Sequence, residues 1–158
     1  MEYAIKEREL WAQPVLLIRR RVQRSQLAAT LGPLYGAIVD HAQRSGAALA
    51  GPPFTRFIEW SAGLVTIEAG LPVAASVVVA GGGEVQSGTL PGGRTATTTH
   101  PGPYDRLLDA YAALERWIEA RGLAPAGAPW EVYVTDPAGL PDPRDWRTEV
   151  FWPIAPRG

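Results

Sequence analysis

Apolar and polar residues alternate along the first half of the chain in a pattern that predicts strands on either side of one helix. Between residues 26 and 45 the apolar residues keep helical spacing, and Gly46 is placed to end that helix in a left-handed conformation. Because Pro33 lies inside this segment, the helix either kinks there or restarts with Gly32 and Pro33 in its first turn. The strands expected in this half are 3–10, 14–22, 55–60 and 64–69.

The second half shows the same order of elements. A helix is predicted from 103 to 121, and Gly122 is placed to stop it. The residues expected to point inward from it are Leu107, Leu108, Tyr111, Leu114 and Ile118. The strands expected in this half are 84–87, 94–100, 131–135 and 147–152.

Residue identities repeat along with the pattern. Gly51 recurs as Gly127 at an offset of 76 residues, and Glu68 recurs as Glu149 at an offset of 81. A duplicated unit of this kind predicts two modules that pack face to face, with a seam in which a pocket tends to lie. The predicted repeats cover about 1–72 and about 84–156, with a linker at about 73–83 whose most flexible part is Gly81 to Gly83.

These patterns predict an α+β fold in which residues 1–158 form a single domain of two pseudo-symmetric strand–helix–strand–strand modules. One helix is too narrow to cover both faces of a sheet of three or four strands, so each module leaves a sheet face open. We therefore expect the two antiparallel sheets to form a shared cleft.

Composition narrows the classes of function. The formal net charge is −1 and no basic stripe dominates, which argues against direct binding of nucleic acid. The absence of cysteine excludes disulfides and thiol catalysis, and His41 and His100 are too far apart, without an acidic cluster, for a metal site. We expect no cofactor. Since the first residues are charged and no apolar run is long enough to cross a bilayer, we expect a cytoplasmic protein without a membrane partner.

Several motifs carry a resemblance to a known family. They are Gly93-Arg94, Thr99-His100-Pro101-Gly102-Pro103-Tyr104, Pro129-Trp130-Glu131-Val132-Tyr133 and Trp146-Arg147-Thr148-Glu149-Val150. Across essentially the whole chain, these motifs and their counterparts in the first half resemble the gyrase-inhibitor-like (GyrI-like) effector-binding family. That family also forms the ligand-sensing half of multidrug-responsive transcription regulators. The resemblance implies two modules around a hydrophobic cleft, where a buried acid binds the positive charge of lipophilic cations. Carried over to this chain, that acid is Glu149, and Glu68 is its match in the first copy.

The chain departs from the regulators in one respect. It moves from Met1 directly into the first expected strand, so we expect no helix-turn-helix domain. Stand-alone relatives in the family include a gyrase-inhibiting protein and hydrolases that open strained cyclopropane rings in DNA-alkylating natural products. The resemblance therefore implies capture of a lipophilic aromatic or cationic small molecule as the first role. A cyclopropane hydrolase is the alternative, which leaves open whether the chain is an enzyme, and binding to gyrase is third.

Both the binding role and the hydrolase role depend on Glu149. Its neighbours are apolar and predict a mostly buried strand. A buried carboxylate is costly unless it is paired or awaits a cation, and burial raises its pKa into the range of a general acid or base. The competing interpretation is a salt bridge to Arg147 or Arg94, or exposure at a strand edge.

Strand alternation makes Tyr133 the second candidate site residue. Glu131 and Tyr133 share one face of their strand, and Trp130 is then expected on the other face, as core against the helix. Tyr133 is either a wall of the cleft, with its hydroxyl beside a ligand or water, or an ordinary half-buried strand tyrosine.

Aromatic residues near the two hairpins are candidate walls for a cation. His100, at the end of a strand and just before a helix, is expected to hydrogen-bond the turn and so to be structural. The candidate catalytic residues are Glu149, Tyr133 and Glu68, and the candidate ligand-binding residues are these three with Phe57, Trp60 and Trp152.

Overall fold

The computed structural model describes residues 2–75 and 83–158, and it divides into two compact units. The first unit comprises residues 12–91, and the second comprises residues 92–158 together with the N-terminal segment up to Trp11. Each unit pairs one α-helix with antiparallel strands, so the expected α+β class and its two modules are confirmed. The cleft expected between the modules concerns the placement of the two units and stays a prediction.

The first unit consists of an antiparallel sheet with α1 on one face. Its elements are β2 (Gln13–Gln23), α1 (Leu27–Ser45), β3 (Phe54–Trp60), β4 (Leu64–Pro72) and β5 (Gln86–Leu90), and the strands lie in the order β3–β4–β2–β5. Ile38 of α1 packs against Ile67 and Ala69 of β4 in a fully buried core. The alternate residues of β4, including Glu68, therefore lie on the face away from α1.

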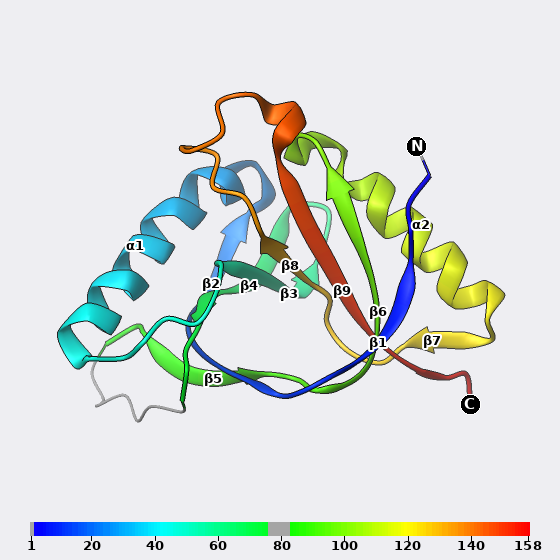
Figure 1. The fold of residues 1–158 in the computed structure, drawn as a ribbon, viewed down its shortest axis with the longest axis horizontal. Helices are drawn as coiled ribbons and strands as arrows, with labels where there is room; N and C mark the ends of the chain where they lie inside the picture. The colour runs from blue at the N-terminus through cyan, green and yellow to red at the C-terminus, as the bar shows by residue number, and fades with distance from the viewer. Residues whose placement is uncertain (1, 76–82) are drawn as a thin grey trace. The chain divides into compact units, whose positions relative to one another are not determined.

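Pro33 does not interrupt α1, which Figure 1 shows in cyan as one continuous helix. A 3-10 turn, Arg24–Gln26, leads into the helix at Leu27, so the alternative in which the helix restarts at Pro33 is wrong. The helix ends at Gly46, whose φ of 74° is left-handed, as predicted.

The second unit repeats this arrangement around α2. Its elements are β1 (Lys6–Leu10), β6 (Gly93–Pro101), α2 (Leu107–Ala120), β7 (Leu123–Pro125), β8 (Trp130–Tyr133) and β9 (Arg147–Pro156), with short 3-10 turns at Tyr104–Arg106 and Pro143–Asp145. The strands lie in the order β1–β6–β9–β8, and β7 pairs with the far end of β9. β6 and β9 run side by side in Figure 1, and Val150 and Ile154 of β9 pack with Leu114 of α2 in the core.

The edge strands are exchanged relative to the sequence repeats. β1 comes before the first unit in the sequence but pairs with β6, with Lys6 opposite Thr97 and Leu10 opposite Gly93. β5 comes before the second unit's strands but pairs with β2. The compact units therefore begin and end at different residues from the predicted repeats. The repeat boundaries stay a prediction.

Matching positions in the two units have matching places in the strand register. Glu68 of β4 lies opposite Arg56 of β3, and Glu149 of β9 lies opposite Val132 of β8, which is the counterpart of Arg56 in the second copy. Most of the expected linker, 76–82, lies outside the described residues, although Val73 forms a β-bridge with Leu49. Among the described residues, no helix has the length and hydropathy to cross a membrane.

Candidate functional site

A buried carboxylate in the second unit is the centre of the candidate site. Glu131 lies on β8 opposite Val150 of β9, and Val150 faces α2, so Glu131 faces α2 as well. Only 6% of its surface is exposed. The Tyr111 hydroxyl on α2 donates to Glu131 Oε2 at 2.8 Å, and the Tyr133 hydroxyl donates to Oε1 at 2.9 Å. Each carboxylate oxygen therefore has one neutral donor.

Local structure explains why these three side chains meet. Glu131 and Tyr133 are two residues apart on a strand, so their side chains leave the same face. Tyr111 follows Leu107 by one helical turn on α2, which places its ring over that face. From the sequence, Trp130 is expected on the face of the strand that meets the helix, with Glu131 and Tyr133 on the opposite face. This face assignment is wrong. Trp130 instead lies on the other face, stacked on Phe151 with ring centroids 5.4 Å apart.

Burial dominates the electrostatics of Glu131. Desolvation raises the pKa of Glu131 above its ordinary value, and the hydrogen bonds from the two tyrosines offset part of this rise. Burial and the neighbouring Glu131 carboxylate raise the pKa of Tyr111 well above its ordinary value, so the phenol stays protonated near neutral pH. Among the described residues, no arginine or lysine forms an ion pair with Glu131. The site therefore holds a carboxylate whose charge no cation of the described chain offsets.

Further aromatic rings contact the two tyrosines that hydrogen-bond this carboxylate. Trp152 of β9 meets Tyr111 edge-on with ring centroids 5.9 Å apart, and Tyr104 meets Tyr133 edge-on at 5.7 Å. Tyr104 also lies over Trp146 at 4.9 Å. Its own pKa is raised by burial, then by the charges of Asp136 and Glu131. The electron-rich faces of such rings attract organic cations.

Two predicted site residues, Tyr133 and Trp152, belong to this cluster, whereas Glu149 lies elsewhere in the same unit. Glu149 is half-buried on the face of β9 away from α2, since it alternates with Val150. Its proposed arginine partners are engaged with other groups. Arg94 pairs with Glu7 at 2.7 Å, and Arg147 donates to the Arg144 carbonyl at 3.1 Å.

The remaining predicted residues lie in the first unit. Glu68 is within ion-pair range of Arg19, at 3.7 Å, and of Arg56, at 3.9 Å. Phe57 packs against the core beneath α1 and meets Trp60 edge-on at 5.6 Å.

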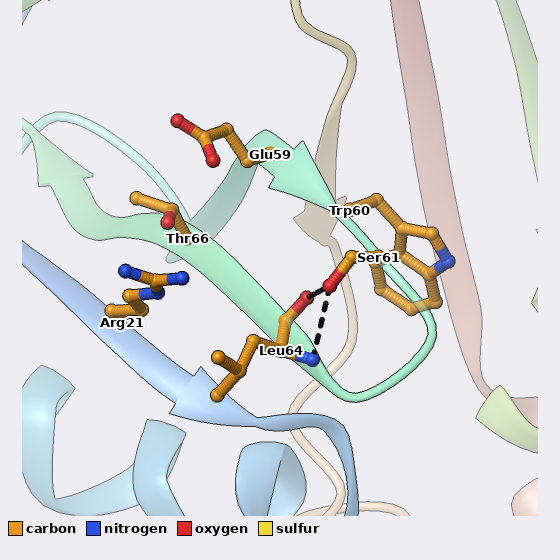
Figure 2. Close-up of a pocket in the computed structure, with 6 residues that line it drawn as sticks. All are labelled: Arg21, Glu59, Trp60, Ser61, Leu64 and Thr66. Carbon is orange, nitrogen blue, oxygen red and sulfur yellow. Dashed lines mark hydrogen bonds between the residues drawn. The ribbon is translucent and has the colours of Figure 1, made fainter.

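Trp60 lies at the turn end of the β3–β4 hairpin, half exposed, with the Arg24 guanidinium 4.4 Å from the centre of its ring. It borders a surface hollow of about 280 Å³, shown in Figure 2, which is also lined by Arg21, Glu59, Ser61, Leu64 and Thr66. The Ser61 hydroxyl closes the hairpin turn through bonds to the backbone of Leu64. The hollow is open, and its lining side chains are mostly exposed and polar.

The duplication contained a signal for Glu131 that sequence analysis did not use. At an offset of 76 residues, Tyr111 and Glu131 match Tyr35 and Thr55, and Tyr35 Oη lies 2.6 Å from Thr55 Oγ1. The same helix-to-strand hydrogen bond thus occurs in both units, and in the second unit its strand partner is an acid.

Buried polar groups among aromatic side chains are typical of small-molecule sites, and the family comparison agrees. The model of the GyrI-like small molecule binding domain matches residues 1–155, so this chain belongs to the GyrI-like small molecule binding domain family. Among curated protein sequences no match was found.

Solved structures share this fold. The crystal structure of the EcmrR C-terminal domain is 25% identical with a TM-score of 0.87, and the match covers 99% of this chain and 100% of that one. In the cryo-EM structure of an EcmrR–DNA complex the identity is 24% and the TM-score 0.84; 98% of this chain is covered, and it spans 58% of that EcmrR chain. A hydrolase from Listeria innocua has 15% identity and a TM-score of 0.64, covering 96% of this chain and 91% of its own. SAV2435 bound to tetraphenylphosphonium has 13% identity and a TM-score of 0.57, covering 98% and 94%.

Proposed function

We propose that this domain captures a lipophilic aromatic cation, and that Glu131 is the acid that binds its charge. One observation carries the proposal: Glu131 is buried, and among the described residues its carboxylate is held by the neutral hydroxyls of Tyr111 and Tyr133. An ionised carboxylate in such a place opposes folding, and a bound cation would remove that penalty. The free energy gained by pairing the charge then appears as ligand affinity.

The surroundings of Glu131 support a ligand that is both aromatic and apolar. Tyr104, Trp146 and Trp152 supply ring faces and edges within the same unit. Cation–π contact and stacking both favour an aromatic cation over a small hydrated one such as an ammonium ion. SAV2435, which shares the fold, has been solved bound to tetraphenylphosphonium, a ligand with these properties.

The proposal transfers the role of the family's acid from Glu149 to Glu131. Glu149 is half-buried on the opposite face of its sheet, and Glu68 has two arginines within ion-pair range. Glu149 and Glu68 therefore serve as matched controls, because each is a strand glutamate outside the aromatic cluster.

Titration of the wild-type domain and single Gln variants with crystal violet, a triphenylmethane cation, tests the proposal. Replacement of Glu131 by Gln keeps the shape of the side chain and removes its charge. We expect the affinity of E131Q to fall by about 1.5–3 kcal/mol, the usual worth of a hydrogen bond to a charged group. E149Q and E68Q should bind within about twofold of wild type.

The neutral leuco form of the dye separates charge from shape. Wild-type protein should bind leuco crystal violet more weakly than the cation, and E131Q should bind the two forms about equally. Equal binding of both forms by wild-type protein would remove the acid from the explanation. A loss of affinity in E149Q alone would return the role to Glu149.

A hydrolase that opens cyclopropane rings is the second candidate, because the raised pKa of Glu131 suits a general base flanked by two hydroxyl donors. In such a step Glu131 takes a proton from water, and the water oxygen bonds to the ring methylene carbon. The strained C–C bond then breaks, and its electron pair passes into the conjugated carbonyl, whose oxygen receives the proton. A structure with the same fold is described as a hydrolase.

Product analysis distinguishes capture from hydrolysis. A spirocyclopropane alkylator incubated with a small amount of protein should, under hydrolysis, be converted through many equivalents to its water adduct. Under capture alone, the protein protects one equivalent and releases the compound unchanged. E131Q serves as the control, since hydrolysis through this carboxylate should disappear in it.

A further inference from the structure

His100 connects the N-terminal segment of the chain to the turn that leads into the candidate site. Its imidazole is fully buried at the end of β6, with 1% of its surface exposed. Nε2 lies 3.0 Å from the Pro103 carbonyl oxygen, and Nδ1 lies 2.8 Å from the Tyr3 hydroxyl. A carbonyl oxygen only accepts, so Nε2 donates to Pro103, and Nδ1 is the ring nitrogen that meets the Tyr3 hydroxyl. Both ring nitrogens are thus engaged by groups on opposite sides.

The turn bonded to His100 carries Tyr104. Gly102 has a φ of 100°, which favours glycine, and its amide donates to the Trp146 carbonyl at 2.9 Å. The next residue, Pro103, accepts from His100, so the turn is held at two consecutive residues. Tyr104 follows directly, and its ring contacts Trp146 and Tyr133. Tyr133 in turn donates to Glu131.

The other side of His100 holds residues 3–5. The Tyr3 ring lies nearly parallel to the imidazole, with centroids 5.9 Å apart, and Ile5 packs against the core of the second unit. Between them, the Ala4 carbonyl accepts from the Thr98 hydroxyl at 2.9 Å. This segment leads into β1, which pairs with β6. A continuous series of contacts therefore runs from the N-terminal segment through His100 and Tyr104 to the buried acid.

We propose that His100 is a positioning residue that holds Tyr104 in the ligand site and couples ligand occupancy to the seating of the N-terminal segment, residues 2–10. The proposal rests on capture of a cation at Glu131. Ligand contact with Tyr104 restrains the turn, the turn restrains His100, and His100 restrains Tyr3. Because binding coupling is reciprocal, a firmly seated segment also raises ligand affinity.

Two amide substitutions separate the two bonds of His100. Glutamine places its amide near the position of Nε2 and keeps the donor to Pro103, whereas asparagine places its amide near Nδ1 and keeps only the contact with Tyr3. We expect H100N to bind crystal violet about threefold to tenfold more weakly, as for the loss of one neutral hydrogen bond. H100Q should bind within about twofold of wild type, a rescue that a general packing role would not produce.

Hydrogen exchange provides the second readout. Crystal violet should slow amide exchange across residues 2–10 in wild-type protein. In H100Q, which keeps the bond to Pro103 but not the contact with Tyr3, the slowing should be confined to the turn. In H100N the dye should have little effect on residues 2–10. Exchange in wild-type protein also decides the matter if H100N fails to fold: no ligand-dependent protection of residues 2–10 would overturn the coupling.

The outcomes separate this inference from the proposed function. If folded H100N binds the dye as wild type does while E131Q does not, the positioning role is wrong and the function of Glu131 stands. If wild-type protein does not bind the dye, capture of the cation and the coupling built on it are both overturned. Equal losses in H100Q and H100N would assign His100 a packing role only.

Discussion

Burial and hydrogen bonding shift the pKa of Glu131 in opposite directions. Burial favours the neutral acid, whereas the hydroxyls of Tyr111 and Tyr133 favour the carboxylate, and burial has the larger effect. Two neutral donors hold an anion in place without neutralising it. The negative charge of the carboxylate is therefore not neutralised, and binding of a proton or an organic cation would neutralise it.

This balance predicts how stability depends on pH. The pKa of Glu131 is raised in the folded state from an unfolded value near 4.5, so above that value the folded protein binds more protons than the unfolded chain. Stability should therefore fall as pH rises from about 4.5 through the folded pKa, and then level off. Urea unfolding at a series of pH values should show this decline in wild-type protein and its absence in E131Q. Parallel profiles for the two proteins would mean that Glu131 is not the titrating group.

Affinity for a permanent cation should change in the opposite direction over the same pH window. Only the carboxylate form pairs with the cation, so binding of crystal violet should strengthen as pH rises through the folded pKa of Glu131 and then become constant. In E131Q the affinity should not change over this window. Fluorescence or calorimetric titration at the pH values used for unfolding provides the measurement.

The sequence indicated part of this site. Tyr133 and Trp152 were expected at a ligand site because aromatic residues beside the hairpin strands are plausible ligand walls, and both lie in the aromatic cluster. Glu131 was missed because alternation states which residues share a face and does not state which face meets the helix. Both faces of β8 are covered at Trp130 and Glu131, which are 3% and 6% exposed, so hydropathy alone placed the tryptophan under α2.

At the scale of elements, a helix tyrosine hydrogen-bonds the neighbouring strand in each unit, with different partners. In the first unit the Tyr35 hydroxyl donates to the Phe54 carbonyl at 3.0 Å and lies 2.6 Å from Thr55 Oγ1. In the second, Tyr111 donates to the Glu131 carboxylate. Hydrogen bonds to charged acceptors are the stronger class.

The two tyrosines therefore form a matched pair of substitutions. Tyr111→Phe should lower the free energy of unfolding at neutral pH by about 1.5–3 kcal/mol, because a buried carboxylate oxygen loses its donor. Tyr35→Phe should cost about 0.5–1.5 kcal/mol, as for a bond between neutral groups. Urea unfolding of both variants measures the difference, and equal losses would contradict a charged Glu131.

Replacing glycine by alanine should have opposite effects on stability in the interior of α1 and at its C-terminal end. Gly36 lies in an exposed helical position where an added Cβ would meet nothing within 4 Å, whereas Gly46 ends the helix with a φ of 74°. Gly36→Ala should stabilise the fold by about 0.5–1 kcal/mol. Gly46→Ala should destabilise it by about 1–2 kcal/mol, because its left-handed backbone crowds a side chain. Thermal or urea unfolding gives both values, and a gain from Gly46→Ala would mean that the helix end rearranges.

Element positions were the most predictable feature of the fold. Both helices and eight strands were expected close to their observed places, because apolar periodicity and the two stop glycines mark them independently. β7 was missed since three residues, Leu123–Pro125, are too few to show alternation. The pairing of edge strands was also not predictable, because β1 and β5 are short and polar or charged, and pairing depends on contacts distant in sequence.

At the scale of the whole molecule, the exchange of edge strands makes the structural units differ from the sequence repeats. Residues 12–91 contain β2, α1, β3, β4 and β5, including both strands that pair with β2. A piece cut at the repeat boundary would keep β1, whose partner β6 is in the other repeat, and would lose β5. The bounds of a cooperative unit should follow the pairing of strands rather than the order of the duplication.

Two fragments of similar length test this distinction. Fragment 12–91 keeps the sheet β3–β4–β2–β5 with α1, so it should show a sigmoidal urea transition followed by circular dichroism. Fragment 1–83 lacks β5, leaves the β2 edge unpaired and carries β1 without β6, so it should unfold at a lower urea concentration or without a clear transition. Gly36→Ala, introduced into both fragments, is the control: it should stabilise 12–91 and leave an unfolded 1–83 unchanged. A higher urea midpoint for 1–83 than for 12–91 would show that the sequence repeat, and not the paired sheet, is the folding unit.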